Sequence, residues 1–325
     1  MCKYFAVIIS LFFLLSCNDE EVFDPLSEPP YDKITDSIRK EPKDAELYYR
    51  RGVMLYGNNQ PVFAARDIRK AWELQPKESY ALSMVTLLKE KNVDSTIKFI
   101  ESALQKLPGN VSLMVDLAEA YHEKGEKEKA ISVCDEIISN YPGQLDALVL
   151  KSTLLKEMDK TAEAISVLEK AYALSPGDVD VVHALAFDLA ENKNPKALKI
   201  ADSLIGVDVE KNHAEPYYFK GVYYSNTGNG MEAIRQFDEA IRRNYNFTQA
   251  YINKGIVYYD MKKYEEAMKV FRLATTVSPT EPGPYYWLGK AEEAVGKKEE
   301  ARLDYQRAYQ LDKTFTEAKE AADRL

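Results

Sequence analysis

The side chains that most often carry catalytic or metal chemistry are few in this chain of 325 residues, which has three His and three Cys. His122, His183 and His213 lack the His-x₃-His or Cys-x₂-Cys spacing that directs several ligands to one metal ion. Carboxylates are abundant, but Glu126 and Glu265 stand in segments punctuated by Lys, which is typical of a solvated helix face. The sequence has no Gly-rich phosphate loop ending in Lys-Ser or Lys-Thr. We therefore predict no enzymatic activity, no metal and no cofactor.

The elements that must position any site repeat with a period of 34 residues. Small and aromatic side chains recur in register at four positions of the C-terminal part of the chain. These positions are Gly221, Gly255 and Gly289; Ala233, Ala267 and Ala301; Phe237, Phe271 and Tyr305; and Ala240, Ala274 and Ala308. Such a period indicates a helix, a tight turn and a second helix, repeated along the chain.

Small residues at these positions have a physical reason. Two helices approach to about 8–10 Å, and the shortest approach requires small side chains where they cross. We predict that seven small residues lie where the two helices of a unit cross, and that neighbouring aromatic side chains fill the remaining space. The seven are Gly52, Gly221, Ala233, Gly255, Ala267, Gly289 and Ala301.

The segment from Thr248 resembles the tetratricopeptide repeat, a family of 34-residue helix-turn-helix units. The matching residues are Tyr251, Gly255, Tyr258, Ala267, Phe271, Ala274 and Pro279, and Lys254 replaces the family's Leu. The resemblance implies an all-α fold, a right-handed superhelical α-solenoid in which each repeat contacts only its neighbours.

Prolines mark the ends of successive units, because a proline stops the second helix and turns the chain. They are Pro42, Pro76, Pro108, Pro142 and Pro176. We predict a solenoid over residues 32–325 with about eight units, at about 45–76, 77–110, 111–144, 145–178, 179–213, 214–247, 248–281 and 282–313. A lone helix before Pro42 and a polar helix over residues 314–325 would cap the two ends.

The fifth unit departs most from the pattern. Pro195 lies at its inter-helix turn, Ala197 comes one residue early, and no proline closes the unit before His213. We expect the superhelix to change pitch there and to divide into an N-terminal and a C-terminal half.

The N-terminus indicates export. Residues 1–16 are an apolar run too short for the ~20 residues of a membrane-spanning helix, and they read as a signal peptide. The run ends in Leu14-Leu15-Ser16-Cys17, which resembles the lipobox of bacterial lipoproteins. The resemblance implies that Cys17 carries palmitate-type acyl chains and anchors the protein to the cell envelope, at the outer membrane. Residues 17–31 would form an acidic, Pro-containing tether.

The acidic residues after Cys17 allow two interpretations. Asp19, Glu20 and Glu21 resemble the export tag of surface lipoproteins in Bacteroidetes, which would place the protein on the external face. A solvated linker explains them equally well. Cys134 is the remaining thiol of the mature chain, and its repeat position predicts a small core residue.

The charge balance bears on the partner. The formal net charge of −9 disfavours nucleic acid, because a phosphate backbone requires a basic surface. The family resemblance implies instead that the first helices of the units line a groove for a protein or peptide partner. The groove positions of the last three units form a mostly apolar and aromatic strip, for which we predict partner binding: Tyr218, Val222, Ile252, Asn253, Ile256, Tyr259, Tyr286, Trp287 and Lys290.

Two functions are consistent with these observations. The first is a lipid-anchored, non-enzymatic scaffold that binds a protein partner at the cell envelope, in assembly, secretion or motility. The alternative is an accessory protein for carbohydrate uptake or envelope polysaccharide handling, in which the aromatic strip stacks on sugar rings. Sugar sites usually pair aromatic rings with clustered polar side chains, and this groove has few, so the protein partner is favoured.

Overall fold

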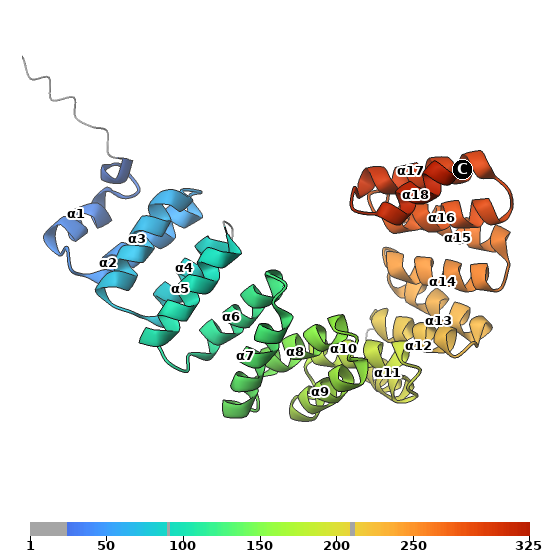
Figure 1. The fold of residues 1–325 in the computed structure, drawn as a ribbon, viewed down its shortest axis with the longest axis horizontal. Helices are drawn as coiled ribbons and strands as arrows, with labels where there is room; N and C mark the ends of the chain where they lie inside the picture. Colours follow the sequence, from blue (N-terminus) through green and yellow to red (C-terminus); the bar gives the residue numbers. More distant parts are fainter. Residues whose placement is uncertain (1–24, 90–91, 209–211) are drawn as a thin grey trace, which may run out of the picture. The chain divides into compact units, whose positions relative to one another are not determined.

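The computed structural model describes residues 25–89, 92–208 and 212–325 (Figure 1). The predicted signal peptide, Cys17 and the acidic residues that follow it lie outside the described residues. Eighteen α-helices and one short 3₁₀ helix make up the described part of the chain, and no strand occurs in it. No described helix has the length and apolar character that crossing a membrane requires. The predicted all-α solenoid of about eight helix pairs is confirmed.

Each pair consists of a helix A followed by a helix B. The A helices are α2 (Ala45–Gly57), α4 (Glu78–Lys89), α6 (Val111–Glu123), α8 (Leu145–Glu157), α10 (Val179–Glu191), α12 (Glu215–Asn226), α14 (Thr248–Asp260) and α16 (Pro282–Ala294). The B helices are α3 (Pro61–Leu74), α5 (Val93–Lys106), α7 (Lys127–Asn140), α9 (Thr161–Leu174), α11 (Lys196–Val207), α13 (Gly230–Arg243), α15 (Tyr264–Val277) and α17 (Lys298–Leu311). The 3₁₀ helix η1 (Pro25–Ser27) and α1 (Asp32–Lys40) precede the pairs, and α18 (Thr316–Arg324) follows them.

The helices fall into two compact units, Met1–Asp116 and Leu117–Leu325. The boundary lies inside α6, the A helix of the third pair. The expectation that the array divides at the fifth pair is therefore wrong about the place of the division. Within the second unit the fifth pair is continuous with its successor, because both α10 and α11 pack against α12.

The turn from helix A to helix B has one recurring backbone feature. A residue with positive φ follows the A helix in seven of the eight pairs that the structure describes. These residues are Asn59, Gly125, Asp159, Lys193, Gly228, Lys262 and Gly296, with φ between 56° and 84°. A left-handed residue at this place ends a helix and reverses the chain within a few residues. The reversal brings each helix B back against its own helix A.

Small residues set the spacing of these pairs. A Cβ atom built on Gly221, Gly255 or Gly289 would lie closer than 3.0 Å to the ring of Phe237, Phe271 or Tyr305 in the paired helix B. A Cβ on Gly52 would lie 2.7 Å from Cγ1 of Ile68. The three alanines predicted to pack in the same way, Ala233, Ala267 and Ala301, are fully buried. These contacts leave no room for a larger side chain where helices A and B cross.

The irregular fifth pair packs against its successor through both helices, and its A helix supplies the aromatic contacts. Phe187 of α10 stacks on Tyr218 of α12 with ring centroids 6.1 Å apart, and His183 meets Phe219 edge-on at 5.4 Å. Helix α11 is shorter than the B helices on either side, and Pro195 occupies its N-cap position. Aromatic contacts between α10 and α12 therefore add to the packing of α11 against α12 at this pair.

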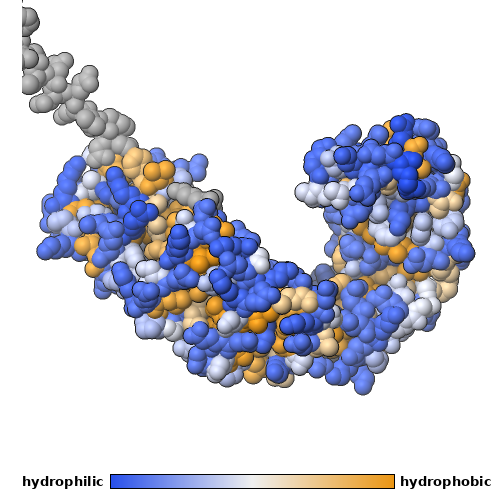
Figure 2. Space-filling model, in the orientation of Figure 1, coloured by the Kyte–Doolittle hydropathy of each residue, from blue (hydrophilic) through white to orange (hydrophobic). Residues whose placement is uncertain are grey.

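Helix α18 covers the C-terminal end of the array. Ala318 and Ala322 of α18 are buried, and Arg324 of the same helix forms an ion pair with Glu293 of α16. Figure 2 shows mostly hydrophilic side chains over α17 and α18. A polar outer face of this kind is what a terminal cap of a repeat array requires.

Candidate partner-binding surface on α14 and α16

Four side chains from two successive A helices form what we call the aromatic–lysine cluster: Tyr259 of α14 and Tyr286, Trp287 and Lys290 of α16. Residues three and four apart on a helix share one face, which places Lys290 beside both aromatic residues of α16. The Nζ atom of Lys290 lies 4.3 Å from the centre of the Trp287 ring, 5.7 Å from that of Tyr259 and 5.8 Å from that of Tyr286. In the described part of the chain, Lys290 has no ion-pair partner.

The rings of the cluster fix one another. Trp287 meets Tyr259 and Tyr286 edge-on, with centroids 6.1 Å and 6.0 Å apart, and stacks on the buried ring of Phe271 at 6.1 Å. Tyr264, at the start of α15, contacts Tyr259 from the other side at 5.2 Å. All four cluster side chains are half-buried. Their positions are thus set before any partner arrives.

The cluster combines three kinds of binding group. Lys290 supplies a positive charge held at ring faces, where aromatic quadrupoles stabilise it. Tyr259 and Tyr286 supply hydroxyl groups, and burial raises the pKa of both, so they remain neutral donors at physiological pH. The half-buried face of Trp287 supplies apolar contact area. Together they can bind a carboxylate that lies next to an apolar side chain.

A second, shallower region lies between α12 and α14. Val222, Asn253 and Ile256 line a cavity of about 140 Å³ together with polar side chains of α10 and α12. Asn253 donates to the hydroxyl group of Tyr218 at 3.0 Å and accepts from Gln249 at 3.1 Å. Its amide group is therefore engaged within the array.

The structure corrects the predicted strip at three positions. Tyr218, Val222 and Ile252 are 7%, 2% and 7% exposed, so they are core residues and not part of a solvent-facing strip. The reason is that successive A helices contact each other directly, which covers side chains aimed at the next A helix. Burial raises the pKa of Tyr218 to about 12. The remaining six positions, Asn253, Ile256, Tyr259, Tyr286, Trp287 and Lys290, are half-buried.

Sequence reasoning missed two parts of this region. Tyr264 and Phe271 of helix B contact the cluster, but in the sequence they resemble ordinary repeat residues. The aromatic residue at the start of α15 could have indicated this contact. A carboxyl pair was also missed, in which Glu292 is buried and Asp304 is half-buried. Burial and a hydrogen bond to Glu292 raise the pKa of Asp304 to about 7, and Arg272 donates to Glu292 at 2.9 Å. These groups lie where α15, α16 and α17 pack together.

The His and Cys residues do not gather in one cluster in the described part of the fold. Among the described residues, no three His, Cys, Asp or Glu side chains meet as a metal-ligand set. Cys134 is fully buried in α7, and burial raises the pKa of its thiol to about 12. A thiol in that state is a packing residue and not a nucleophile.

The fold is an α-helical repeat solenoid. Its helix pairs are spaced by small residues, helices cap its two ends, and its A helices carry the candidate binding surface. The chain belongs to the tetratricopeptide repeat family. Tetratricopeptide repeat models match residues 87–152, residues 220–282, and residues 145–178 with 283–315. Proteins of this family are generally non-catalytic scaffolds for protein–protein interaction.

Solved structures and a curated relative agree with this assignment. A tetratricopeptide repeat protein from Parabacteroides merdae superposes with a TM-score of 0.60 and 17% identity, covering 86% of this chain and 98% of that one. A chain of the APC/C hetero-tetramer Cut9-Hcn1 gives a TM-score of 0.51 and 14% identity, covering 92% of this chain and 59% of that one. An uncharacterized protein of Methanocaldococcus jannaschii is 38% identical over 58 residues, which is 18% of this chain and 67% of the relative. At these identities the two solved structures show the fold alone.

Proposed function

We propose that this protein is a lipid-anchored scaffold of the bacterial cell envelope that binds a protein partner through the aromatic–lysine cluster. The observation that carries the proposal is Lys290. It is a cation held among three aromatic rings without an ion-pair partner in the described part of the chain, on a half-buried surface of an interaction fold. Aromatic and basic side chains are enriched among the residues that dominate the binding energy of protein interfaces.

The chemistry of the cluster defines the partner. A carboxylate would approach the ammonium group of Lys290, and an adjacent apolar side chain would lie on the ring of Trp287. We therefore expect a peptide or protein segment with an acidic residue next to a large apolar one. Asn253 is not expected to contribute, because its amide group is held by Tyr218 and Gln249.

The test reverses one charge. Lys290→Glu places a carboxylate where the partner's carboxylate binds and disturbs no ion pair of the fold. The matched control is Lys269→Glu, which makes the same change in net charge on the exposed face of α15. A hydrogen bond to a charged group contributes about 1.5–3 kcal/mol. We expect Lys290→Glu to lower the recovery of the partner from solubilised envelopes more than tenfold, with helicity unchanged.

Two outcomes would contradict the proposed site. Equal recovery by the two variants would show that the cluster does not bind the partner. Recovery of envelope polysaccharide in place of protein, lost on Trp287→Ala and retained in Lys290→Glu, would favour the carbohydrate alternative. Because Trp287 also stacks on Phe271, the circular dichroism of Trp287→Ala must match that of the wild type before its binding is interpreted.

The lipid anchor is part of the same proposal and rests on the residues before Cys17. A structural neighbour from Parabacteroides merdae is in keeping with a Bacteroidetes-like source of the chain. A single acyl chain gives only marginal binding, so two or more chains on one residue are needed for a lasting anchor. We expect Cys17→Ser to move the protein from the membrane fraction to the soluble fraction without changing its thermal midpoint. Sedimentation of this variant with membranes after a carbonate wash would contradict acylation of Cys17.

A further inference from the structure

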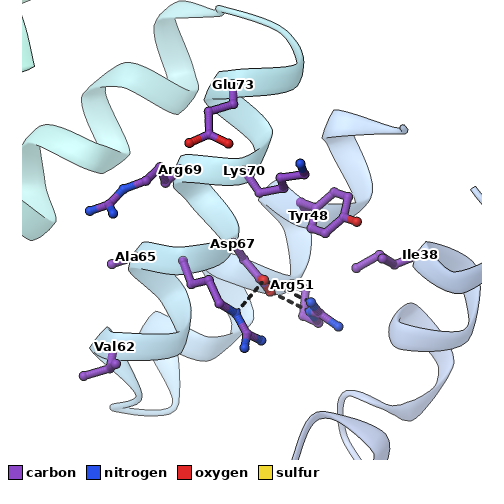
Figure 3. Close-up of a pocket in the computed structure, with 10 residues that line it drawn as sticks. Ile38, Tyr48, Arg51, Val62, Ala65, Asp67, Arg69, Lys70 and Glu73 are labelled. Atoms are coloured by element: carbon purple, nitrogen blue, oxygen red, sulfur yellow. Dashed lines mark hydrogen bonds and ion pairs between the residues drawn. The ribbon is translucent and has the colours of Figure 1, made fainter. Parts of the chain in front are cut away.

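A second surface with unbalanced charge lies in the first unit, on the outer face of α3. A cleft of about 630 Å³ opens between α1, α2 and α3 (Figure 3). Arg66, Arg69 and Lys70 of α3 line it, together with Ile38 of α1 and Tyr48 of α2. The three cationic side chains are exposed. We call Arg66, Arg69 and Lys70 the basic face of α3.

The floor of the cleft is a closed polar network. Arg51 is 5% exposed and donates through Nη2 to Asp67 at 2.9 Å and through Nη1 to Thr35 at 3.0 Å. Its Nε group donates to the other carboxylate oxygen of Asp67. Asp67 is 1% exposed, so its charge is neutralised by Arg51 and gives little compensation to the side chains above it. Arg66 approaches Asp67 only to 3.8 Å.

The basic face of α3 differs from α13 and from the N-terminal half of α17 in the partners of its arginines. On α13, Arg235 and Arg242 each pair with a glutamate one turn earlier in the chain. On α17, Arg302 pairs with Glu299 in the same way. Such pairs neutralise an exposed arginine within its own helix.

On α3 the residues three positions before the two arginines carry no negative charge. Phe63 precedes Arg66 by three positions, and its ring centre lies 5.4 Å from the guanidinium group. Arg66 itself precedes Arg69 by three positions, so the two guanidinium groups repel. Among the described residues, neither Arg69 nor Lys70 has an ion-pair partner. Two acidic residues of the same helix compensate this charge only in part, because Asp67 is shared by Arg66 and Arg51, and Glu73, which also lines the cleft, forms no ion pair with another described residue.

The excess of positive charge extends over the first three helices. Helices α1, α2 and α3 contain eight Lys and Arg against five Asp and Glu, and residues 25–75 as a whole, with the loops included, contain nine against eight. The whole chain contains 43 Lys and Arg against 52 Asp and Glu. Val62, 71% exposed, lies on the same outer face of α3, next to the cations. An apolar side chain among cations suits the interface between lipid headgroups and acyl chains.

The place of the basic face in the chain selects its partner. The first described residues are fastened to the first repeat, because Leu26 is 3% exposed and its carbonyl group accepts from Thr35. Cys17 precedes Pro25 by eight residues, which span roughly 28 Å at most. An acylated Cys17 would therefore hold α1–α3 close to the membrane surface.

We propose that the basic face of α3 binds the phosphate groups of anionic lipids and orients the anchored protein on the membrane. This inference rests on the lipid anchor of the proposed function. The same lipids repel the acidic remainder of the chain. Attraction of the basic face and repulsion of the remainder therefore favour the same orientation of the protein on the membrane. The acyl chains keep the protein at the membrane, and the basic face determines which end of the first unit touches it.

The test uses the mature chain without acyl groups, from residue 17 with Cys17→Ser, and vesicles of phosphatidylglycerol or of phosphatidylcholine at about 20 mM salt. We expect it to sediment with the first and not with the second. Each Lys or Arg near an anionic surface contributes about fivefold to partition, so Arg66→Gln with Arg69→Gln should weaken it on the order of 25-fold. The matched control is Arg235→Gln with Arg242→Gln, which makes the same change in net charge on α13.

The control separates the proposed surface from net charge. We expect the control variant to bind phosphatidylglycerol vesicles as the wild type does. Equal losses in the two double variants, or no sedimentation of the wild type with phosphatidylglycerol, would overturn the proposal. Binding of inorganic phosphate at a few millimolar, measured by calorimetry, with no sedimentation on vesicles would also overturn it, since the site would then take free phosphate only. Acylation of Cys17 does not enter this assay, so failure of the anchor and failure of the basic face are distinguishable.

Discussion

Gly255 offers the sharpest test of how the helix pairs are spaced. A Cβ atom at this position would lie closer than 3.0 Å to three ring atoms of Phe271, and that ring is fully buried between α14 and α15. Overpacking of this kind costs about 1–3 kcal/mol. Alanine is favoured over glycine inside a helix by up to about 1 kcal/mol. Because the ring has no free space to enter, we expect Gly255→Ala to lower the free energy of unfolding by about 1–2 kcal/mol.

The assay is chemical denaturation followed by circular dichroism, with two further variants. Gly206→Ala is the matched control, because a Cβ on Gly206 meets nothing within 4 Å and the residue lies in an exposed part of α11. It should be neutral or stabilising by up to about 1 kcal/mol. Phe271→Leu removes the ring that the new methyl group would strike. Combined with Gly255→Ala, it should cost less than the sum of the two single changes.

The reasoning would be refuted if Gly255→Ala stabilised the protein as Gly206→Ala does. It would also fail if the costs of Gly255→Ala and Phe271→Leu were additive, since the methyl group and the ring would then not be in contact.

Three further predictions concern charged and buried groups. The pKa of Asp304 is raised from 3.8 to about 7, so its protonated form contributes stability that is lost as the pH rises through 7. The free energy of unfolding should therefore fall by about 1–3 kcal/mol between pH 5 and pH 8. In denaturation curves, Asp304→Asn should abolish this dependence on pH. Arg51→Met leaves Asp67 charged and buried without its partner, so it should cost about 3–5 kcal/mol, and Asp67→Asn in the same chain should recover part of that loss in thermal melts. With the two cysteines near the N-terminus replaced by serine, Cys134 should react with a thiol reagent only on unfolding; fast labelling of the native protein would contradict its burial.

The fold was largely predictable from the sequence because one physical constraint repeats. Gly221, Gly255 and Gly289 recur at one period, since each meets an aromatic ring of its own helix B, and a helix pair of constant geometry requires a constant period. The division inside α6 was not predictable in this way. It depends on how much each helix contacts its neighbours over the whole array, which no local pattern records.

The candidate site was predictable only in part. A helical projection places Tyr286, Trp287 and Lys290 on one face, and the structure brings them together as the projection requires. The projection failed at Tyr218 and Ile252 because burial there depends on the neighbouring A helices, which the residues of a single helix do not reveal. The same limit concealed Arg69 and Lys70 of α3, which have no ion-pair partner among the described residues, although the missing acidic residue one turn before Arg69 was visible in the sequence.

The contact of Tyr286 with the residue that opens α18 links partner binding to the end of the array. Tyr286 lies 4.8 Å from the ring of Phe315, and Arg324 at the end of α18 binds Glu293 of the same helix, α16. In a solenoid the last helix has a neighbour on one side only, so its local opening costs less free energy than unfolding of the whole protein. A partner that binds Tyr286 in this position would stabilise the docked state of α18 and slow the amide hydrogen exchange of that helix. Opening of the terminal helix would then determine how often the binding surface is complete. A ligand bound on α16 would be detected first as slower amide exchange in Thr316–Arg324.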